Sequence, residues 1–202
     1  MSKKSWYIFA PVLAGVLIFL DQITKYLARR DLGEAGYSII DGVFKLSLVE
    51  NKGAAWGMFQ GGVDILSIIS IILIIVLVFF FIKIPEGKRY FLIRLLVTIV
   101  FAGAIGNEID RLFVGYVTDF LYFELIDFPV FNVADCYITV GMILFAILML
   151  FYYKDEDLEF FSFRKKAESA DKAQENGEIS ENSKETGTEN NDAGEDSENE
   201  NT

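Results

Sequence analysis

Histidine is absent from all 202 residues of this chain. Without it there can be no Ser-His-Asp or Cys-His catalytic group, no HExxH zinc site and no histidine proton relay. Cysteine occurs once, as Cys136, which excludes an internal disulfide and a cysteine-rich metal site. Because no histidine is present to activate Cys136, we favour packing at a helix start over a nucleophilic role for it.

Positive charge is scarce at the C-terminal end. The net charge is −11, and residues 155–202 hold sixteen of the 29 acids but only five of the 18 bases, so the rest of the chain is electrically balanced. From about Glu168 the chain is Glu, Asn, Ser, Gly and Asp with almost nothing apolar, so it cannot bury a core. We expect residues 156–202 to form an acidic disordered cytoplasmic tail. A solvated extension is the simpler interpretation of this tail, and a partner-binding segment is the alternative.

Long apolar runs dominate the remaining sequence, which is 52% hydrophobic overall and contains 19 Phe. Four runs are long enough to cross a hydrocarbon core of ~30 Å as helices. The first resembles a signal peptide, but Asp21-Gln22 follows it in place of a cleavage site, so we interpret it as a retained span. We therefore predict an all-α membrane domain over residues 1–155, a four-transmembrane-helix bundle with spans at about 7–27, 63–82, 91–109 and 133–153.

Lysine and arginine set the expected orientation, because short cytoplasmic segments are enriched in both. The basic residues before the first span, between the second and third, and after the fourth place both termini in the cytoplasm. The first outer loop weakens this pattern, since it also carries four bases. In this topology the four aspartates of interest converge on the extracytoplasmic face: Asp21, Asp110, Asp119 and Asp135.

The first outer loop carries a strand signal. Phe44, Leu46 and Leu48 alternate with polar residues, which is typical of a half-buried strand, and Asp41-Gly42 before them is a hairpin-turn signal. We expect a small extracytoplasmic β-sheet on the membrane surface, anchored at the headgroups by Trp56 and Phe59.

Asp119 and Asp135 are the candidate catalytic residues. An ionised carboxylate beside a lipid phase is costly, so it usually marks a functional site. Two carboxylates that converge can share one proton and activate water without a metal. The alternative is that each caps a helix end or pairs with Arg111.

Three further motifs accompany the two aspartates. Asp21 and Lys25 have the spacing of a helix salt bridge, although an interfacial anchor would look the same. Small residues around Gly103 allow close helix packing in lipid, Asn107 presents an amide inside the bundle, and Asp110-Arg111 can form a charge pair at the interface. The segment 51–57 is a turn rich in small residues that could approach a ligand closely.

Together these motifs resemble the lipoprotein signal peptidases, the type II signal peptidases of bacteria. The resemblance covers residues from about 15 to 150, in the order of the family. Five motifs carry it: Asp21-Gln22-x-x-Lys25, Asn51-x-Gly53-Ala54-Ala55-x-Gly57, Gly103-Ala104-x-Gly106-Asn107-x-x-Asp110-Arg111, Val117-x-Asp119-Phe120 and Phe131-Asn132-x-Ala134-Asp135. One departure is Ala102-Gly103, where the family often has Gly-Gly.

The resemblance implies an aspartic endopeptidase of the bacterial plasma membrane with Asp119 and Asp135 as its catalytic pair. It would cleave diacylglyceryl-modified prolipoproteins just before the lipid-bearing lipobox cysteine, with no cofactor, no metal, no covalent intermediate and no nucleic acid. A monomer in contact with membrane lipids is expected, as is sensitivity to globomycin-type inhibitors, and a stretch near 56–62 would help cover the site. The supporting residues carried over from the family are Asp21, Lys25, Asn51, Gly53, Gly103, Asn107, Asp110, Arg111, Asn132 and Ala134.

Two other classes of protein remain open from the residues alone. A small proton-coupled transporter would also carry buried aspartates, but it would spread them through the membrane depth. A scaffold would use Asn107 and the small residues only to join helices, and it would tolerate the loss of either aspartate.

Overall fold

The computed structural model describes residues 3–33, 35–53, 63–154 and 157. Every helix and strand of these described residues belongs to one compact unit, Met1–Lys154. The predicted anchors Trp56 and Phe59, the expected cover near 56–62 and nearly all of the acidic tail lie outside the described residues.

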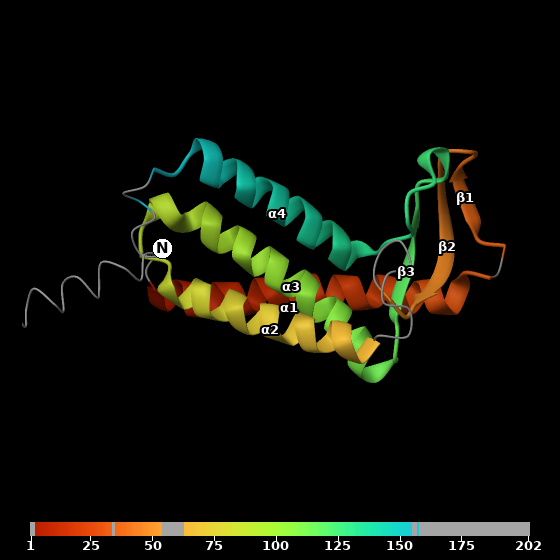
Figure 1. The fold of residues 1–202 in the computed structure, drawn as a ribbon, viewed down its shortest axis with the longest axis horizontal. Helices are drawn as coiled ribbons and strands as arrows, with labels where there is room; N and C mark the ends of the chain where they lie inside the picture. Colours follow the sequence, from red (N-terminus) through yellow and green to blue (C-terminus); the bar gives the residue numbers. More distant parts are fainter. Residues whose placement is uncertain (1–2, 34, 54–62, 155–156, 158–202) are drawn as a thin grey trace, which may run out of the picture. The chain divides into compact units, whose positions relative to one another are not determined.

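Four long helices form a bundle (Figure 1). They are α1 (Lys3–Asp31), α2 (Val63–Lys83), α3 (Phe91–Phe113) and α4 (Val133–Phe151). All four are long and apolar enough to cross a membrane. Together with a small antiparallel sheet they confirm the predicted fold class, and α3 continues beyond Ile109, where the apolar run was expected to end.

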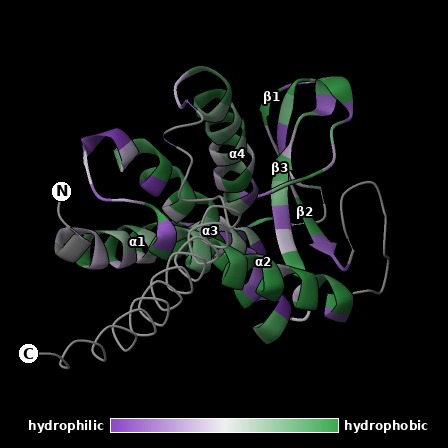
Figure 2. Ribbon diagram, turned by 60° about the vertical axis from the view of Figure 1, so that its left-hand side comes forward, coloured by the Kyte–Doolittle hydropathy of each residue, from purple (hydrophilic) through white to green (hydrophobic). Residues whose placement is uncertain are grey.

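Helix α3 is the centre of the bundle, because it packs against each of the other three helices. Close approach to α4 depends on glycine: a Cβ on Gly103 would lie 2.6 Å from the carbonyl oxygen of Ala134. Helix α2 faces outward along its length, and of its residues, all described, only Ser67 is buried. Figure 2 shows the hydrophobic colouring of α2, as expected of a helix that faces lipid.

A three-stranded antiparallel sheet lies at the end of the bundle where α1 and α3 finish and α4 begins (Figure 1). Its strands are β1 (Tyr37–Ile40), β2 (Phe44–Asn51) and β3 (Val117–Tyr122), in the order β1-β2-β3. The predicted turn joins β1 to β2, and Gly42 supplies its positive φ of 69°. Two 3-10 turns, η2 (Lys88–Tyr90) and η3 (Glu124–Ile126), complete the fold.

Strand β3, which carries Asp119 in the connection between α3 and α4, was not predicted. Residues 117–120 are buried one after another, so the segment has none of the polar alternation that marks a strand with one solvated face. Strand β2 was predicted from its alternating apolar and polar residues. Residues 44–48 are all partly exposed, however, so buried and exposed side chains do not alternate there.

The opposite end of the bundle is closed by a buried cation. Arg94 of α3 is 2% exposed and donates to the carbonyl oxygen of Ile84, just after α2, at 2.5 Å. Its guanidinium lies 5.2 Å from the ring of Phe81 and 5.8 Å from that of Trp6 on α1. These contacts join three helices at the end away from the sheet.

Candidate active site

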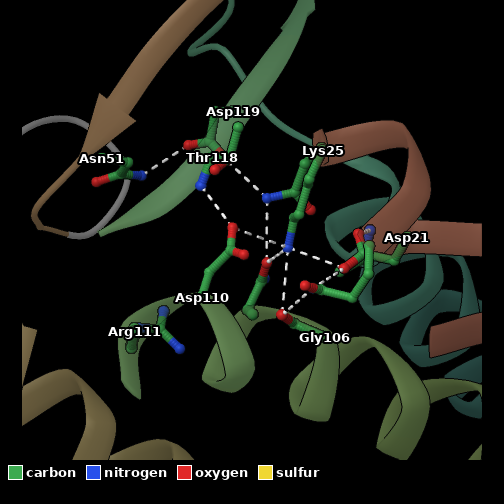
Figure 3. Close-up of polar contacts among 12 residues, drawn as sticks. Asp21, Lys25, Asn51, Gly106, Asp110, Arg111, Thr118 and Asp119 are labelled. Atoms are coloured by element: carbon green, nitrogen blue, oxygen red, sulfur yellow. Dashed lines mark hydrogen bonds and ion pairs between the residues drawn. The ribbon is translucent and has the colours of Figure 1, made fainter. Parts of the chain in front are cut away.

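Asp119 projects from β3 and is only 2% exposed. Each of its carboxylate oxygens accepts a hydrogen bond from an asparagine amide, Oδ1 from Asn132 Nδ2 at 2.6 Å and Oδ2 from Asn51 Nδ2 at 2.9 Å (Figure 3). The Asn51 amide is itself oriented, because its Oδ1 accepts the backbone N–H of Gly53 at 2.9 Å. Asn51, the last residue of β2, therefore holds one side of Asp119, and Gly53 in the turn that follows holds Asn51.

Asp135 lies in the first turn of α4, where Asn132 is the N-cap. The two residues form a reciprocal capping box: Asp135 N donates to Asn132 Oδ1 at 3.0 Å, and Asn132 N donates to Asp135 Oδ2 at 3.1 Å. The other carboxylate oxygen of Asp135 accepts from Asn107 Nδ2 of α3 at 2.8 Å. Helix capping and an amide from the central helix thus fix this carboxylate in place.

Asn132 connects the two aspartates directly. Its fully buried side chain donates to Asp119 Oδ1 and also to Asn107 Oδ1 at 3.1 Å, while its backbone and side chain hold Asp135. The sequence analysis named Asn132 only as a supporting residue, and the structure makes it the one described residue hydrogen-bonded to both aspartates.

A buried cation lies behind the aspartates. Lys25 of α1 has no exposed side-chain surface, and its Nζ lies 2.9 Å from Asp21 Oδ2, 2.8 Å from Asn107 Oδ1 and 3.6 Å from Asp110 Oδ2. Asp21 Oδ1 in turn accepts the backbone N–H of Ala134 at 2.9 Å, next to Asp135. The predicted Asp21–Lys25 pair is therefore present, but as a fully buried pair and not as an interfacial anchor (Figure 3).

Asp110 connects this cluster to the sheet. Its Oδ2 accepts the backbone N–H of Thr118, the residue before Asp119, at 2.8 Å. Arg29 of α1 reaches the same place, with Nη1 at 3.4 Å from Asp110 Oδ1 and 2.5 Å from Thr118 Oγ1. The sequence analysis missed Arg29 and Thr118, although the spacing of Arg29, four residues after Lys25 on the same helix face, is a signal that could have found Arg29.

The predicted pairing of Asp110 with Arg111 is wrong. Arg111 lies on another side of α3, where its Nη1 is 3.5 Å from Glu108 Oε2, and Glu108 also accepts a hydrogen bond from Ser67 of α2. In Figure 3 the guanidinium of Arg111 is apart from the residues around Lys25. Neighbours in sequence point about 100° apart around a helix, and here Asp110 faces Lys25 while Arg111 faces Glu108.

Glycine lets side chains of α1 reach the backbone of α3 in this cluster. A Cβ on Gly106 would lie 2.5 Å from Asp21 Oδ2. The carbonyl oxygen of Gly106 accepts from Gln22 Nε2 at 2.9 Å and from Lys25 Nζ at 3.4 Å. Gly106 therefore gives α1 direct access to the backbone of α3.

The electrostatics of the site favour a proton on one aspartate. Burial, together with the negative charge of Asp135, raises the pKa of Asp119 from an ordinary value of 3.8 to about 7. The amide donors of Asn51 and Asn132 oppose this rise, because they stabilise the charged carboxylate. Near neutral pH this arrangement can hold one protonated and one charged carboxylate, which is the state needed for acid–base work on water. Among the described residues, no three His, Cys, Asp or Glu side chains are grouped so as to hold a metal ion.

Several known proteins are similar to this chain. The family described as Signal peptidase (SPase) II matches residues 13–151. A lipoprotein signal peptidase of Caldanaerobacter subterraneus subsp. tengcongensis is 44% identical over 144 residues, which are 70% of this chain and 96% of that protein. Another, from Fusobacterium nucleatum subsp. nucleatum, is 43% identical over 139 residues, which are 68% of this chain and 83% of that protein.

Solved structures show the same fold. One described as a bacterial membrane enzyme is 35% identical to this chain, with a TM-score of 0.65, and the match covers 70% of this chain and 87% of that one. A second with the same description is 34% identical, with a TM-score of 0.64, over 72% of this chain and 94% of that one.

Proposed function

The chain belongs to the signal peptidase II family, which makes it a multi-pass membrane protease that removes signal peptides from prolipoproteins, and from this premise we propose that it is an aspartic endopeptidase. Asp119 and Asp135 would activate the attacking water. The observation that carries the proposal is the hydrogen bonding of both carboxylates to a single residue, Asn132. Because members of this family are proteases, we do not propose the transporter or the scaffold as the protein's function.

The proposed reaction divides the work between the two carboxylates. The charged one takes a proton from water, and the protonated one donates to the carbonyl oxygen of the scissile peptide bond, so the tetrahedral intermediate forms without an acyl-enzyme. The two carboxylates share this proton, and the raised pKa of Asp119 keeps it on the pair near neutral pH. When the intermediate collapses, the carboxyl group that took the proton from water gives it to the leaving nitrogen. A hydroxyl of the intermediate returns a proton to the other carboxylate as the carbonyl re-forms, so the pair regains its starting state.

The surrounding residues would hold the two carboxylates in a fixed position relative to each other. Asn51, Asn107 and Asn132 hold the four carboxylate oxygens through N–H donors, so the carboxylates need little reorganisation during reaction. Lys25 offsets the negative charge of Asp21 and Asp110 beneath them. In this proposal Arg111 is not part of the group around Lys25, and Gly53, Gly103 and Ala134 act through the backbone.

The substrate we propose is a prolipoprotein whose lipobox cysteine carries a diacylglyceryl thioether, cleaved just before that cysteine without a metal. The site would lie at the extracytoplasmic face, with both termini in the cytoplasm, so that the lipid of the substrate stays in the bilayer. Globomycin-type inhibitors would occupy this site, and the enzyme would act as a monomer. The clustering of both aspartates at the sheet end of the bundle supports this placement.

The decisive experiment removes one carboxylate at a time. We expect Asp119→Asn and Asp135→Asn each to lower the rate of cleavage of a diacylglyceryl-modified prolipoprotein by about 10³-fold or more, because each abolishes acid–base exchange at one position. The rate of signal-peptide release by purified, reconstituted enzyme is the measurement.

Asp64→Asn is the matched control, since Asp64 is an exposed carboxylate at the start of α2. It should cleave at the rate of the unaltered enzyme. Cleavage at that rate by a correctly folded Asp119→Asn or Asp135→Asn variant would refute the aspartic mechanism.

A further inference from the structure

An apolar turn projects from the sheet where β3 ends, away from Asp119. This apolar turn comprises residues 123–128 and contains η3. Leu125 and Ile126 are 69% and 68% exposed, and Phe123 and Phe128 are 42% and 43% exposed. The turn belongs to none of the four membrane-length helices, so the length of a span does not account for its apolar surface.

The backbone of the apolar turn is held in shape. Asp127 has a φ of 48°, which is unfavourable for a residue other than glycine, and Tyr122 holds it by donating from its hydroxyl to Asp127 Oδ1 at 2.7 Å. Phe128 N donates to the carbonyl oxygen of Phe123 at 3.2 Å. The turn thus presents Leu125 and Ile126 outward in a defined conformation.

Aromatic contacts join the apolar turn to the start of α4. The ring of Phe123 lies 5.0 Å from that of Phe44 on β2 and 5.6 Å from that of Phe131. Phe131 also contacts Phe128 at 5.8 Å and pairs with Leu121 of β3, and α4 begins two residues later at Val133. The height of the turn along the bundle is therefore set by the beginning of a membrane-length helix.

The charges of the apolar turn are only negative. Glu124 and Asp127 are its ionisable residues, and the sequence contains no lysine or arginine between Arg111 and Lys154. The turn itself therefore offers no positive charge to anionic headgroups, although Lys45 of β2 pairs with Tyr122 beside it, and apolar contact is the favourable term that its own residues supply.

We propose that the apolar turn inserts into the edge of the hydrocarbon layer beside the start of α4, with the lipid surface itself as its partner. The exposed apolar surface of α4 continues into the bilayer from the same place, with Val140 and Ile143 55% and 56% exposed. Insertion would give the sheet a second attachment to the membrane besides the helices, and so fix its tilt. This inference is independent of the aspartic mechanism.

Spin labels can measure the depth of the turn. Leu125→Cys and Ile126→Cys, each in a Cys136→Ala background, would be nitroxide-labelled and reconstituted into phosphatidylcholine vesicles. We expect both labels to be several-fold more accessible to oxygen than to an aqueous nickel chelate, and adding anionic phosphatidylglycerol should not deepen them. Glu50→Cys is the control: it is 53% exposed in β2 near the other end of the sheet, and it should show the aqueous pattern.

Aqueous accessibility at both turn positions would overturn the proposal. Spin–spin broadening that grows with protein density would overturn it in favour of a second copy of this chain. If the Cys136→Ala background does not fold, Ile126→Trp in the native chain replaces it. The added fluorescence should be quenched by brominated phosphatidylcholine, whereas quenching by aqueous iodide alone would contradict insertion.

Discussion

Asn132 serves two purposes at once, because its side chain caps α4 and also holds Asp119 Oδ1 at 2.6 Å. We predict that Asn132→Ala lowers kcat by about 10²-fold to 10³-fold, as the loss of one preorganised donor does in other enzymes. It should also destabilise the protein by about 1 kcal/mol through loss of the cap. Cleavage kinetics and thermal unfolding would measure the two effects.

Asn132→Ser separates these two roles. Serine is a good N-cap but has no amide to donate to Asp119, so stability should recover while kcat stays low. Recovery of kcat along with stability would show that only the cap matters at this position.

The pH dependence of cleavage follows from Asp119. Between its ordinary pKa of 3.8 and its raised pKa of about 7, the folded protein holds a proton that the unfolded chain has lost. The contribution of this group to the free energy of unfolding therefore falls as pH rises through that interval and is lost above about 7. We predict that kcat/KM falls about tenfold per pH unit above about 7, where the proton of the pair is lost.

Asn51→Leu is the internal test of this assignment. Asn51 donates to the charged form of Asp119, so its loss should raise the pKa further and move the alkaline fall in kcat/KM to higher pH. A profile that stays flat across this range in both proteins would exclude Asp119 as the titrating group.

At the scale of elements, α3 organises the site because its glycines let other helices reach its backbone. A Cβ on Gly106 would lie 2.5 Å from Asp21 Oδ2, so we predict that Gly106→Ala destabilises the protein by about 1–3 kcal/mol and displaces the Asp21–Lys25 pair. Thermal unfolding and cleavage should both report the change.

Gly15→Ala in α1 is the matched control. Nothing lies within 4 Å of the Cβ that it would add, and alanine has the higher helix propensity, so its stability should be unchanged or slightly raised. Equal stability of the two variants would mean that helix α1 can move away from Gly106 at no cost.

At the scale of the whole molecule, the four bases of the first outer loop are a weaker argument against the proposed orientation than the sequence alone suggested. Arg29, one of its four bases, is engaged with Asp110 and Thr118, so it serves the fold as well as the charge pattern. We predict that alkaline phosphatase fused to the C-terminus is inactive. Alkaline phosphatase folds only after export, and the proposed orientation keeps the C-terminus in the cytoplasm. Fusion after Gly115, beyond three spans, should be active, and the reverse pattern would invert the topology.

Several features could be predicted from the sequence alone because their signals are local. A continuous apolar run reveals a membrane-length helix without reference to any partner, and all four helices are found near their predicted places. The turn at Gly42 and the Asp21–Lys25 pair are equally local, since each depends on residues at most four positions apart. The choice of Asp119 and Asp135 depended on the cost of a carboxylate beside lipid, which is a property of residue type.

The tertiary structure alone decided how these residues are held. Asp119 lies on a strand because β2 pairs with it, and Lys25 meets Asn107 across 82 positions of sequence. Likewise, Asp110 faces Lys25 while its neighbour Arg111 faces Glu108. Such contacts depend on which face each helix turns toward the others. The packing of the whole bundle sets these faces, because residue spacing within a single element carries no information about its partners.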